Sequence, residues 1–354
     1  MPDDSANGPA PAPYADLTPG GVLDALDGVG LRGDGRLIQL NSYENRVYQV
    51  FLESGRVVVA KFYRPGRWSN AQILEEHAFA TELAASEIPV AVPIGLEIDA
   101  HSPHADAVES NGATLACART EAGAMYRFGV TERLAGRAPE LENPEVLRWL
   151  GRYIGRLHAV GAAAPFVHRV ALDVASYGDV SRDFLLEQRL VSDDVVARWS
   201  GLADRALAAC RDAFAAASPR RIRLHGDCHP GNVLWTDASG PHFVDLDDAV
   251  GGPAVQDVWM LLSGDRAAMT RQLLDVLDGY ESFMDFDWRE LRLVEPLRTL
   301  RVLHHSAWIA RRWSDPTFPI NFPWFASPAY WADQCTRLAE QLEAMAEPPL
   351  GSPG

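Results

Sequence analysis

The sequence predicts an α+β fold of two lobes, in which a β-rich N-terminal lobe precedes a mainly helical C-terminal lobe. The first observation is length, because 354 residues correspond to about two domains of ordinary size. The second is a change of pattern near residue 134, where β-branched runs give way to runs with the helical period of apolar residues. The third is composition, since 47% hydrophobic and 23% charged residues are typical of a globular chain with a sizeable core. The predicted segments are a disordered leader at 1–13, an N-terminal lobe at 14–134, a C-terminal lobe at 135–349 and a tail at 350–354.

The N-terminal lobe is predicted to contain one main helix among several strands. Ser69 and Gln72 have the spacing of a capping box at the start of that helix, and Pro65 ends the strand before it. A polar, irregular stretch at 99–113 is expected to be an insertion or a loop. The predicted elements are a short helix from Leu17 that stops at Gly28 and Gly30, a hairpin or loop-linked pair of strands within 36–53, a strand at 56–65, a helix at 73–87 and strands at 113–120 and 124–134.

Helices dominate the predicted C-terminal lobe. A helix over 141–161 starts near Pro144 and carries a clear apolar stripe, and further helices are expected within 180–217. A β-rich island at 222–248 follows. Helices resume at Pro253 and continue to the end, with an interruption at the proline- and aromatic-rich run DPTFPINFPWFASP.

The charge balance excludes several classes of partner. Lys and Arg number 32 and Asp and Glu number 48, which leaves a formal net charge of −16. Nucleic acids and anionic membrane surfaces bind through positive charge, so we expect neither as a partner. The four cysteines form no C-x-x-C pair, and the acidic N-terminus lacks the basic start of a signal peptide. No apolar run reaches the ~18 residues that span a membrane, so these features predict a reduced cytoplasmic protein, which we expect to be a monomer.

The residues most indicative of chemistry lie in the segment 223–259. Asp227 and Asn232 stand five positions apart around a Pro-Gly turn, and a strand, a turn and a second strand lead from them to Asp245. A hairpin of this kind would return Asp245 beside the loop that holds the other two. One carboxylate can then accept the proton of a hydroxyl, while an amide oxygen and a second carboxylate can hold Mg²⁺. This is the arrangement that phosphoryl transfer to a hydroxyl requires.

The motifs around these residues resemble those of a known group of enzymes. LHGDCHPGNVLW and FVDLDD resemble the aminoglycoside phosphotransferase and choline kinase superfamily, whose fold is protein-kinase-like. Together with LNSYENRVYQV, VVAKFYRPGRW, ILEEHAFATEL and RRWSDPTFPINFPWF, they resemble the stress response kinase A family of bacterial serine/threonine protein kinases. The resemblance extends from about Leu17 to about Pro349 and is weakest over 99–122. It implies a bilobal kinase-like fold, an ATP-binding N-terminal lobe, ATP and Mg²⁺ as cofactors, and protein Ser or Thr hydroxyls as acceptors, the chain itself among them.

The resemblance also implies roles for individual residues. Asp227 corresponds to the catalytic base, and Asn232 and Asp245 correspond to the Mg²⁺ ligands, with Asp245 also an active-site residue. Ser42 corresponds to a residue of the loop that covers the phosphates of ATP, although LNSYENRVY contains no glycine. Lys61, on the strand VVVAK, resembles the lysine that contacts those phosphates. Backbone groups of 131–134 are expected to bind adenine.

Lys61 requires a glutamate from the next helix, and two candidates exist. Glu76 shares a helix face with the apolar residues Ile73 and Leu83, whereas Glu75 lies about 100° round the helix, nearer solvent. A carboxylate that faces the core needs a cationic partner, so we predict that Glu76 pairs with Lys61.

Other polar residues have structural as well as functional interpretations. Asp257 is predicted to brace the loop of Asp227 from below, and His225 is predicted to hydrogen-bond the backbone of that loop. Asp247 and Asp248 either lie in solvent or approach the metal. The Arg and His residues of the C-terminal helices either cover a solvated or packed face or recognise the substrate, and they are Arg298, Arg301, His304, His305, Arg311 and Arg312.

Three other functions stay open beside the protein kinase. A small-molecule kinase of the aminoglycoside, homoserine or choline type uses the same catalytic residues, although the C-terminal arginines argue against an aminated substrate. A non-catalytic nucleotide-binding module would be indicated by the loss of Asp227 or Asp245, and both are present. A zinc hydrolase would use His225, Asp227 and His229 on one face of a strand, which Pro230 and the glycine after it disfavour.

Overall fold

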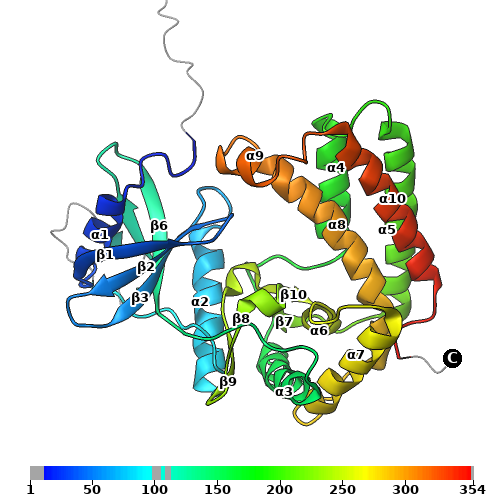
Figure 1. The fold of residues 1–354 in the computed structure, drawn as a ribbon, viewed down its shortest axis with the longest axis horizontal. Coiled ribbons are helices and arrows are strands. Elements are labelled where there is room, and N and C mark those ends of the chain that lie inside the picture. The colour runs from blue at the N-terminus through cyan, green and yellow to red at the C-terminus, as the bar shows by residue number, and fades with distance from the viewer. Residues whose placement is uncertain (1–11, 98–104, 108–112, 352–354) are drawn as a thin grey trace, which may run out of the picture. The chain divides into compact units, whose positions relative to one another are not determined.

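A computed structural model of the chain describes residues 12–97, 105–107 and 113–351. Most of the predicted leader, part of the predicted insertion and the end of the predicted tail lie outside these residues. The chain divides into two compact units, whose elements are labelled in Figure 1. The first combines the residues up to Leu74 with Pro93–Arg133 and Arg312–Phe322. The second combines Glu75–Val92, Leu134–Arg311 and the residues from Pro323 onward.

The first unit is built on one antiparallel sheet of six strands in the order β1-β2-β3-β6-β5-β4. Val58, Ala60 and Phe62 alternate as fully buried residues along β3, the period expected of a strand with one face on the core. The strand pair predicted within 36–53 is β1 and β2, so that prediction is confirmed. The strands span Gly33–Leu40 (β1), Arg46–Leu52 (β2), Val57–Phe62 (β3), Ala105–Ala107 (β4), Ala116–Arg119 (β5) and Met125–Glu132 (β6).

Two predicted helix starts are confirmed by their caps. Thr18 Oγ1 accepts a hydrogen bond from the backbone N–H of Gly21 (3.1 Å) at the start of α1 (Pro19–Asp27), which packs on the sheet. At α2 (Asn70–Ala85), the N–H of Ser69 donates to Gln72 Oε1 (2.9 Å), and the N–H of Gln72 donates to Ser69 Oγ (3.3 Å). The helix α2 begins in the first unit and continues into the second.

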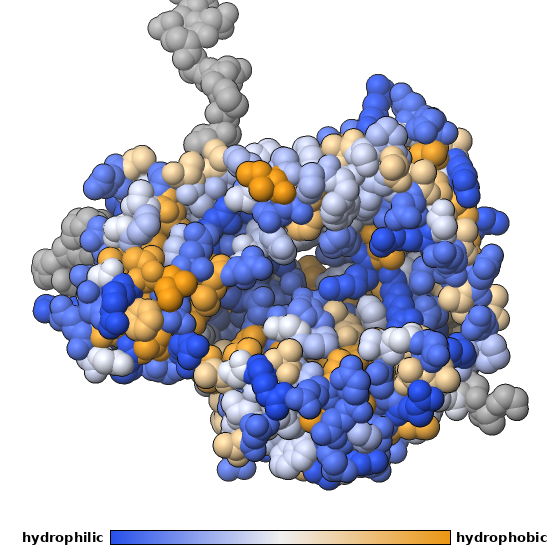
Figure 2. Space-filling model, viewed as in Figure 1, coloured by the Kyte–Doolittle hydropathy of each residue, from blue (hydrophilic) through white to orange (hydrophobic). Residues whose placement is uncertain are grey.

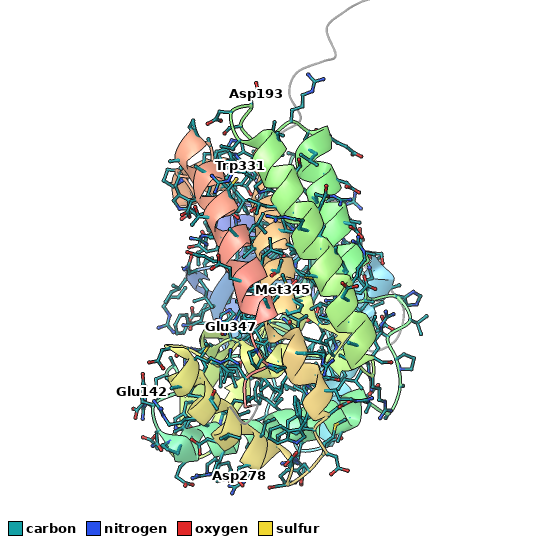
Figure 3. All side chains as sticks on the ribbon, turned by 90° about the vertical axis from the view of Figure 1, so that its right-hand side faces the viewer. Glu142, Asp193, Asp278, Trp331, Met345 and Glu347 are labelled. Carbon is teal, nitrogen blue, oxygen red and sulfur yellow. The ribbon has the colours of Figure 1, made fainter. Side chains whose placement is uncertain are left out.

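Helices make up most of the second unit. The helices α5, α8 and α10 pack against one another, and Figure 3 shows α10, with Trp331 labelled, beside α5. The ring of Trp199 on α5 lies edge-on to that of Trp331. None of the helices in the described part of the chain is long and apolar enough to cross a membrane. The helices are α3 (Pro144–Gly161), α4 (Val180–Glu187), α5 (Val196–Ala217), α6 (Val255–Trp259), α7 (Arg266–Tyr280), α8 (Val294–Arg311) and α10 (Pro328–Ala346), while the short α9 (Thr317–Asn321) belongs to the first unit.

Two small antiparallel sheets organise the segment predicted as a β-rich island. They pair β7 (Ile222–Leu224) with β10 (Val250–Gly252) and β8 (Val233–Thr236) with β9 (Gly240–Phe243). Hydrophilic residues cover most of the second unit on the face drawn in Figure 2, as expected for a chain of net charge −16. Strands that concentrate early and helices that concentrate late confirm the predicted α+β fold class.

The helices α3 and α7 cross with their backbones in direct contact, and glycine makes this possible. A Cβ at Gly151 of α3 would overlap the backbone oxygen of Val276, and a Cβ at Gly279 of α7 would overlap the backbone oxygen of Arg148. The two helices reach this separation only because both positions lack a side chain.

We expect Gly151→Ala to lower the free energy of unfolding by about 1–3 kcal/mol, because the added methyl group must push two backbones apart. Gly201→Ala is the matched control, since Gly201 lies within α5 with open space where its Cβ would be. There alanine should raise the free energy of unfolding by up to about 1 kcal/mol through its better helix propensity. Urea unfolding measures both changes, and a Gly151→Ala protein as stable as the wild type would contradict the close crossing.

Candidate active site

The loop between β7 and β8, residues 225–232, carries the predicted catalytic base and is called the catalytic loop below. It ends in a short 3-10 turn, Pro230–Asn232, from which β8 starts at Val233. Because Val233 pairs with Phe243 in the β8–β9 hairpin, Asn232 lies opposite Val244, whose N–H donates to the Asn232 backbone oxygen (3.0 Å). Asp245 follows directly. The hairpin therefore brings Asn232 and Asp245 together, as their spacing predicted.

A buried carboxylate fixes the start of the catalytic loop. Asp257, in the first turn of α6, accepts hydrogen bonds from the backbone N–H groups of His225 and Gly226, both at 2.8 Å. Its Oδ2 also accepts from His158 Nε2 (3.0 Å), and His158 Nδ1 shares a hydrogen bond of 3.0 Å with the Tyr280 hydroxyl. The predicted bracing role of Asp257 is confirmed.

His225 has a structural role, but its hydrogen-bond partner is not in the catalytic loop, where it was predicted. Its Nε2 donates to the backbone oxygen of Val244 (3.0 Å), which ties the catalytic loop to the residue before Asp245. His225 and His229 do not lie on a strand, because β7 ends at Leu224, so the shared strand face that a zinc site would need is absent. Within the described ranges, no group of three or more His, Cys, Asp or Glu side chains could hold a metal ion.

Asp227 is surrounded by groups that favour its charged form. Arg301 Nη1 of α8 lies 2.9 Å from Asp227 Oδ1, while His229 Nε2 lies 3.5 Å from Oδ2. Burial alone would raise the pKa of Asp227, but the hydrogen bond from His229 and the charge of Arg301 hold the pKa well below its ordinary value. Asp227 is therefore a carboxylate at neutral pH, as a hydroxyl-orienting base must be.

Asn232 and Asp245 fit the chemistry of a hard cation such as Mg²⁺. The side-chain Nδ2 of Asn232 donates to the backbone oxygen of Asp227 (2.9 Å), which directs its Oδ1, the only possible ligand atom of the amide, the other way. Asp245 is exposed and has the left-handed backbone conformation (φ 62°, ψ 56°) that Asp tolerates better than most residues. Both side chains thus offer oxygen, the donor that Mg²⁺ prefers.

The two candidate glutamates of α2 have different partners. Glu75 is occupied by the backbone N–H groups of residues 167–169, two of them at 2.9 and 2.7 Å. Glu76 is only 5% exposed, and its Oε2 lies 3.9 Å from a guanidinium nitrogen of Arg169. The Glu75 carboxylate therefore serves a loop, and the cation found beside Glu76 is Arg169. The pairing of Glu76 with Lys61 of β3 was predicted from the helix face that Glu76 shares with apolar residues. That pairing stays a prediction.

Arg169 also links α2 to the residues after Asp245, a role that the sequence analysis missed. Its guanidinium donates to the backbone oxygens of Asp247 and Ala249, the latter at 2.8 Å. Asp247 is buried, so the alternative that it lies in solvent is wrong. A lone arginine in a polar loop carries no local signal of such a contact.

In the first unit, residues 41–45 connect β1 to β2. This loop, which was predicted to cover the phosphates of ATP, is called the nucleotide loop below. Ser42 Oγ accepts a hydrogen bond from the N–H of Asn45 (3.3 Å), which closes a tight turn. Arg64, just after β3, donates from Nε to the backbone oxygen of Glu44 (2.9 Å) and from Nη2 to that of Tyr43 (3.2 Å). The loop is thus held without glycine.

The segment Arg312–Phe322, called the C-terminal strap below, packs against the nucleotide loop within the same unit. Arg312 Nε lies 2.6 Å from Glu44 Oε2, and the buried Asp315 lies 2.7 Å from Arg64 Nη2. The ring of Phe322 lies 5.1 Å from that of Tyr43. The proline- and aromatic-rich interruption predicted in the C-terminal helices is therefore a support for the nucleotide loop.

The other predicted Arg and His residues of α8 have separate positions. Arg301 meets Asp227, whereas Arg298 is bonded to Glu295 and lies over the ring of Trp259. Arg311 is exposed and lies over the ring of Phe184. Among these three, Arg301 is the one that contacts a predicted site residue.

Comparisons with known proteins agree with this geometry. The profile of the phosphotransferase enzyme family matches residues 36–294. Stress response kinase A of Escherichia coli strain K12 is 43% identical over 343 residues, which cover 95% of this chain and 96% of that protein. The serine/threonine protein kinase RdoA of Salmonella typhimurium is 42% identical over 337 residues, with the same coverage of 95% and 96%.

The chain belongs to the stress response kinase A family. Solved structures agree on the kinase-like fold: an amicoumacin kinase in complex with AMP-PNP, Ca²⁺ and Ami superposes with a TM-score of 0.64 at 19% identity over 90% of each chain. A microcompartment-associated aminopropanol kinase gives the same TM-score of 0.64 at 17% identity, over 92% of this chain and 97% of that one. The family and fold predicted from the motifs are confirmed, and this member of the family is a kinase-type phosphotransferase.

A second buried carboxylate supports the helix that carries Asp257. Glu290 accepts a hydrogen bond from the N–H of Val255 (2.9 Å) at the start of α6, and burial raises the pKa of Glu290 to about 7. The folded protein therefore binds a proton at Glu290 that the unfolded chain releases near pH 4.5.

The free energy of unfolding should consequently fall as the pH rises from about 5 to about 8. Over this range Glu290 ionises in the folded state, where its charge is buried, whereas in the unfolded chain the charge lies in water. Glutamine at position 290 cannot ionise, so the free energy of unfolding of Glu290→Gln should not fall in this way. The difference between Glu290→Gln and the wild type should therefore grow by about 2–3 kcal/mol from pH 5 to pH 8. Urea unfolding at pH 5 and pH 8 measures the change. Glu340→Gln, on the exposed side of α10, controls for the loss of one charge. Parallel pH profiles of the wild type and Glu290→Gln would count against the raised pKa.

The C-terminal strap yields a prediction for nucleotide binding. Asp315→Asn weakens the ion pair with Arg64, so the nucleotide loop should lose its fixed geometry and the Kd for ATP should rise about tenfold. Titration calorimetry on protein shown to be folded by circular dichroism measures the affinity. Asp333→Asn is the control, because Asp333 forms an exposed pair with Arg337 on α10. An unchanged Kd in Asp315→Asn would show that the strap does not set the loop.

Proposed function

We propose that this chain is an ATP- and Mg²⁺-dependent protein kinase that phosphorylates Ser or Thr hydroxyls in a bacterial stress response. The observation that carries the proposal is the catalytic loop, in which Asp227 is held by the Asp257 brace beside Asn232 and Asp245. The names of the two bacterial relatives support the acceptor and the setting, since one is called stress response kinase A and the other a serine/threonine protein kinase.

The reaction follows from these residues. The acceptor oxygen forms a bond to the γ-phosphorus while the bond from phosphorus to the β,γ-bridging oxygen breaks, and ADP leaves. Asp227 orients the hydroxyl and takes its proton. Asn232 and Asp245 would hold Mg²⁺, which neutralises phosphate charge when bound. Ser42 and Lys61 are assigned to the phosphates of ATP by the family resemblance.

The charge beside Asp227 supports a protein acceptor over an aminated small molecule. Arg301 lies on the same carboxylate that must meet the acceptor hydroxyl. An aminoglycoside, choline or aminoalcohol would bring a second positive charge close to the guanidinium of Arg301, and the two charges would repel each other. A Ser or Thr side chain carries no such charge.

The proposal includes the setting in which the kinase acts. All four cysteines are free, and Cys210, Cys228 and Cys335 are buried, which supports a reducing compartment such as the cytoplasm. We infer that the chain acts as a monomer on protein substrates, itself among the candidate acceptors, and on neither nucleic acids nor membranes.

Transfer of label from γ-labelled ATP with Mg²⁺ tests the proposal. The acceptors are a generic basic protein, an acidic protein, the kinase itself and a panel of small molecules. We expect label on Ser or Thr, and a loss of at least about 100-fold in Asp227→Ala. Asp237→Ala is the control, because Asp237 is an exposed residue of the β8–β9 turn. Label on small molecules alone would overturn the protein acceptor, and no transfer to any acceptor would overturn the kinase.

A further inference from the structure

Arg301 contacts the predicted catalytic base, and much of its side chain is exposed to solvent. Its Nη1 lies 2.9 Å from Asp227 Oδ1, and 48% of its side chain is exposed. In the described part of the chain, Asp227 is the one carboxylate with which Arg301 forms an ion pair. A guanidinium has five N–H donors, so most of its hydrogen-bonding capacity is directed elsewhere than at Asp227.

Arg301 and Arg298 lie on the same helix but have different kinds of partner. Arg298, one turn earlier on α8, is bonded to Glu295 and stacked on Trp259, which explains it as a structural residue. Arg301 instead shares a carboxylate that the reaction itself needs. The chain has 48 acidic and 32 basic residues, so the positive charge beside the predicted base is opposite in sign to the net charge of the protein.

We infer that Arg301 determines acceptor specificity by binding an anionic group, a carboxylate or a phosphate, that flanks the acceptor Ser or Thr. This inference rests on the proposed function. Because Asp227 contacts the acceptor hydroxyl, a guanidinium bonded to Asp227 lies within one or two residues of that hydroxyl along a bound peptide. Arginine binds both anions through paired, charge-assisted hydrogen bonds, which supply geometry as well as attraction. The preferred acceptors are therefore Ser or Thr residues in acidic or previously phosphorylated sequences.

A peptide series tests this inference on the full-length kinase. One serine peptide is made in four forms, with flanking Asp, phosphoserine, Ala or Lys, and kcat and KM are measured for each with ATP and Mg²⁺. The wild type should prefer the acidic forms to the Lys form by about tenfold or more in kcat/KM. The Asp and phosphoserine forms distinguish a carboxylate from a phosphate as the better ligand.

Substitutions at Arg301 should change this preference. Arg301→Ala should raise KM for the acidic peptides by about tenfold, with a smaller change for the Ala peptide. Arg301→Lys retains the charge without the paired donors, so it should keep part of the preference. Arg301→Glu should favour the Lys peptide. Arg211→Ala is the matched control, since Arg211 is 49% exposed and pairs at 2.5 Å with Asp179, which belongs neither to the catalytic loop nor to α8.

The outcomes separate this inference from the proposed function. Asp227-dependent transfer that shows no acidic preference, or an Arg301→Ala variant that loses the same factor on every peptide, would overturn the specificity role and leave the kinase intact. Loss of the preference in Arg211→Ala would overturn it as well. No transfer to any peptide by the wild type would instead contradict the proposed function.

Discussion

The buried carboxylate of Asp257 is the constraint on which the candidate active site depends. A charge without solvent must be satisfied by hydrogen bonds, and Asp257 receives them from two consecutive N–H groups of the catalytic loop and from His158. These bonds fix the direction in which the loop leaves β7. The loop in turn sets the start of β8, and the β8–β9 hairpin returns the chain to Asp245. One carboxylate therefore determines the placement of the residues that are proposed to act on the substrate.

The features that the sequence could predict are those that depend on residues close together in the chain. A capping box, a helical period and a hairpin each depend on residues within a few positions, so Ser69, the buried face of α2 and the return to Asp245 were all predictable. The contacts of Arg301 with Asp227 and of Asp315 with Arg64 join residues 74 and 251 positions apart. Such ion pairs leave no periodic or spacing signal, because each partner alone resembles an ordinary surface charge. The fold class and family therefore followed from the sequence, whereas these supports did not.

The nucleotide loop, which is predicted to cover the phosphates of ATP, is held in place without glycine. A glycine-rich loop approaches phosphates closely because it lacks side chains, at the cost of flexibility. Here Arg64 and the C-terminal strap hold a loop without glycine through backbone and carboxylate contacts. Buried ion pairs add little net stability, but removing one partner leaves an uncompensated charge. Their value at this loop is thus a single, defined geometry for Ser42 and its neighbours.

The environment of Asp227 indicates which part of the chemistry the protein controls. Arg301 and His229 stabilise the charged form of Asp227, and a carboxylate with so low a pKa is a weak base. A strong base would matter if the hydroxyl had to be deprotonated before attack. In the loose transition state of phosphoryl transfer, the nucleophile forms little bond before the leaving group departs, so its orientation matters more than its early ionisation. For the proposed reaction, a carboxylate of defined direction and little basicity suits alignment of the acceptor over its activation.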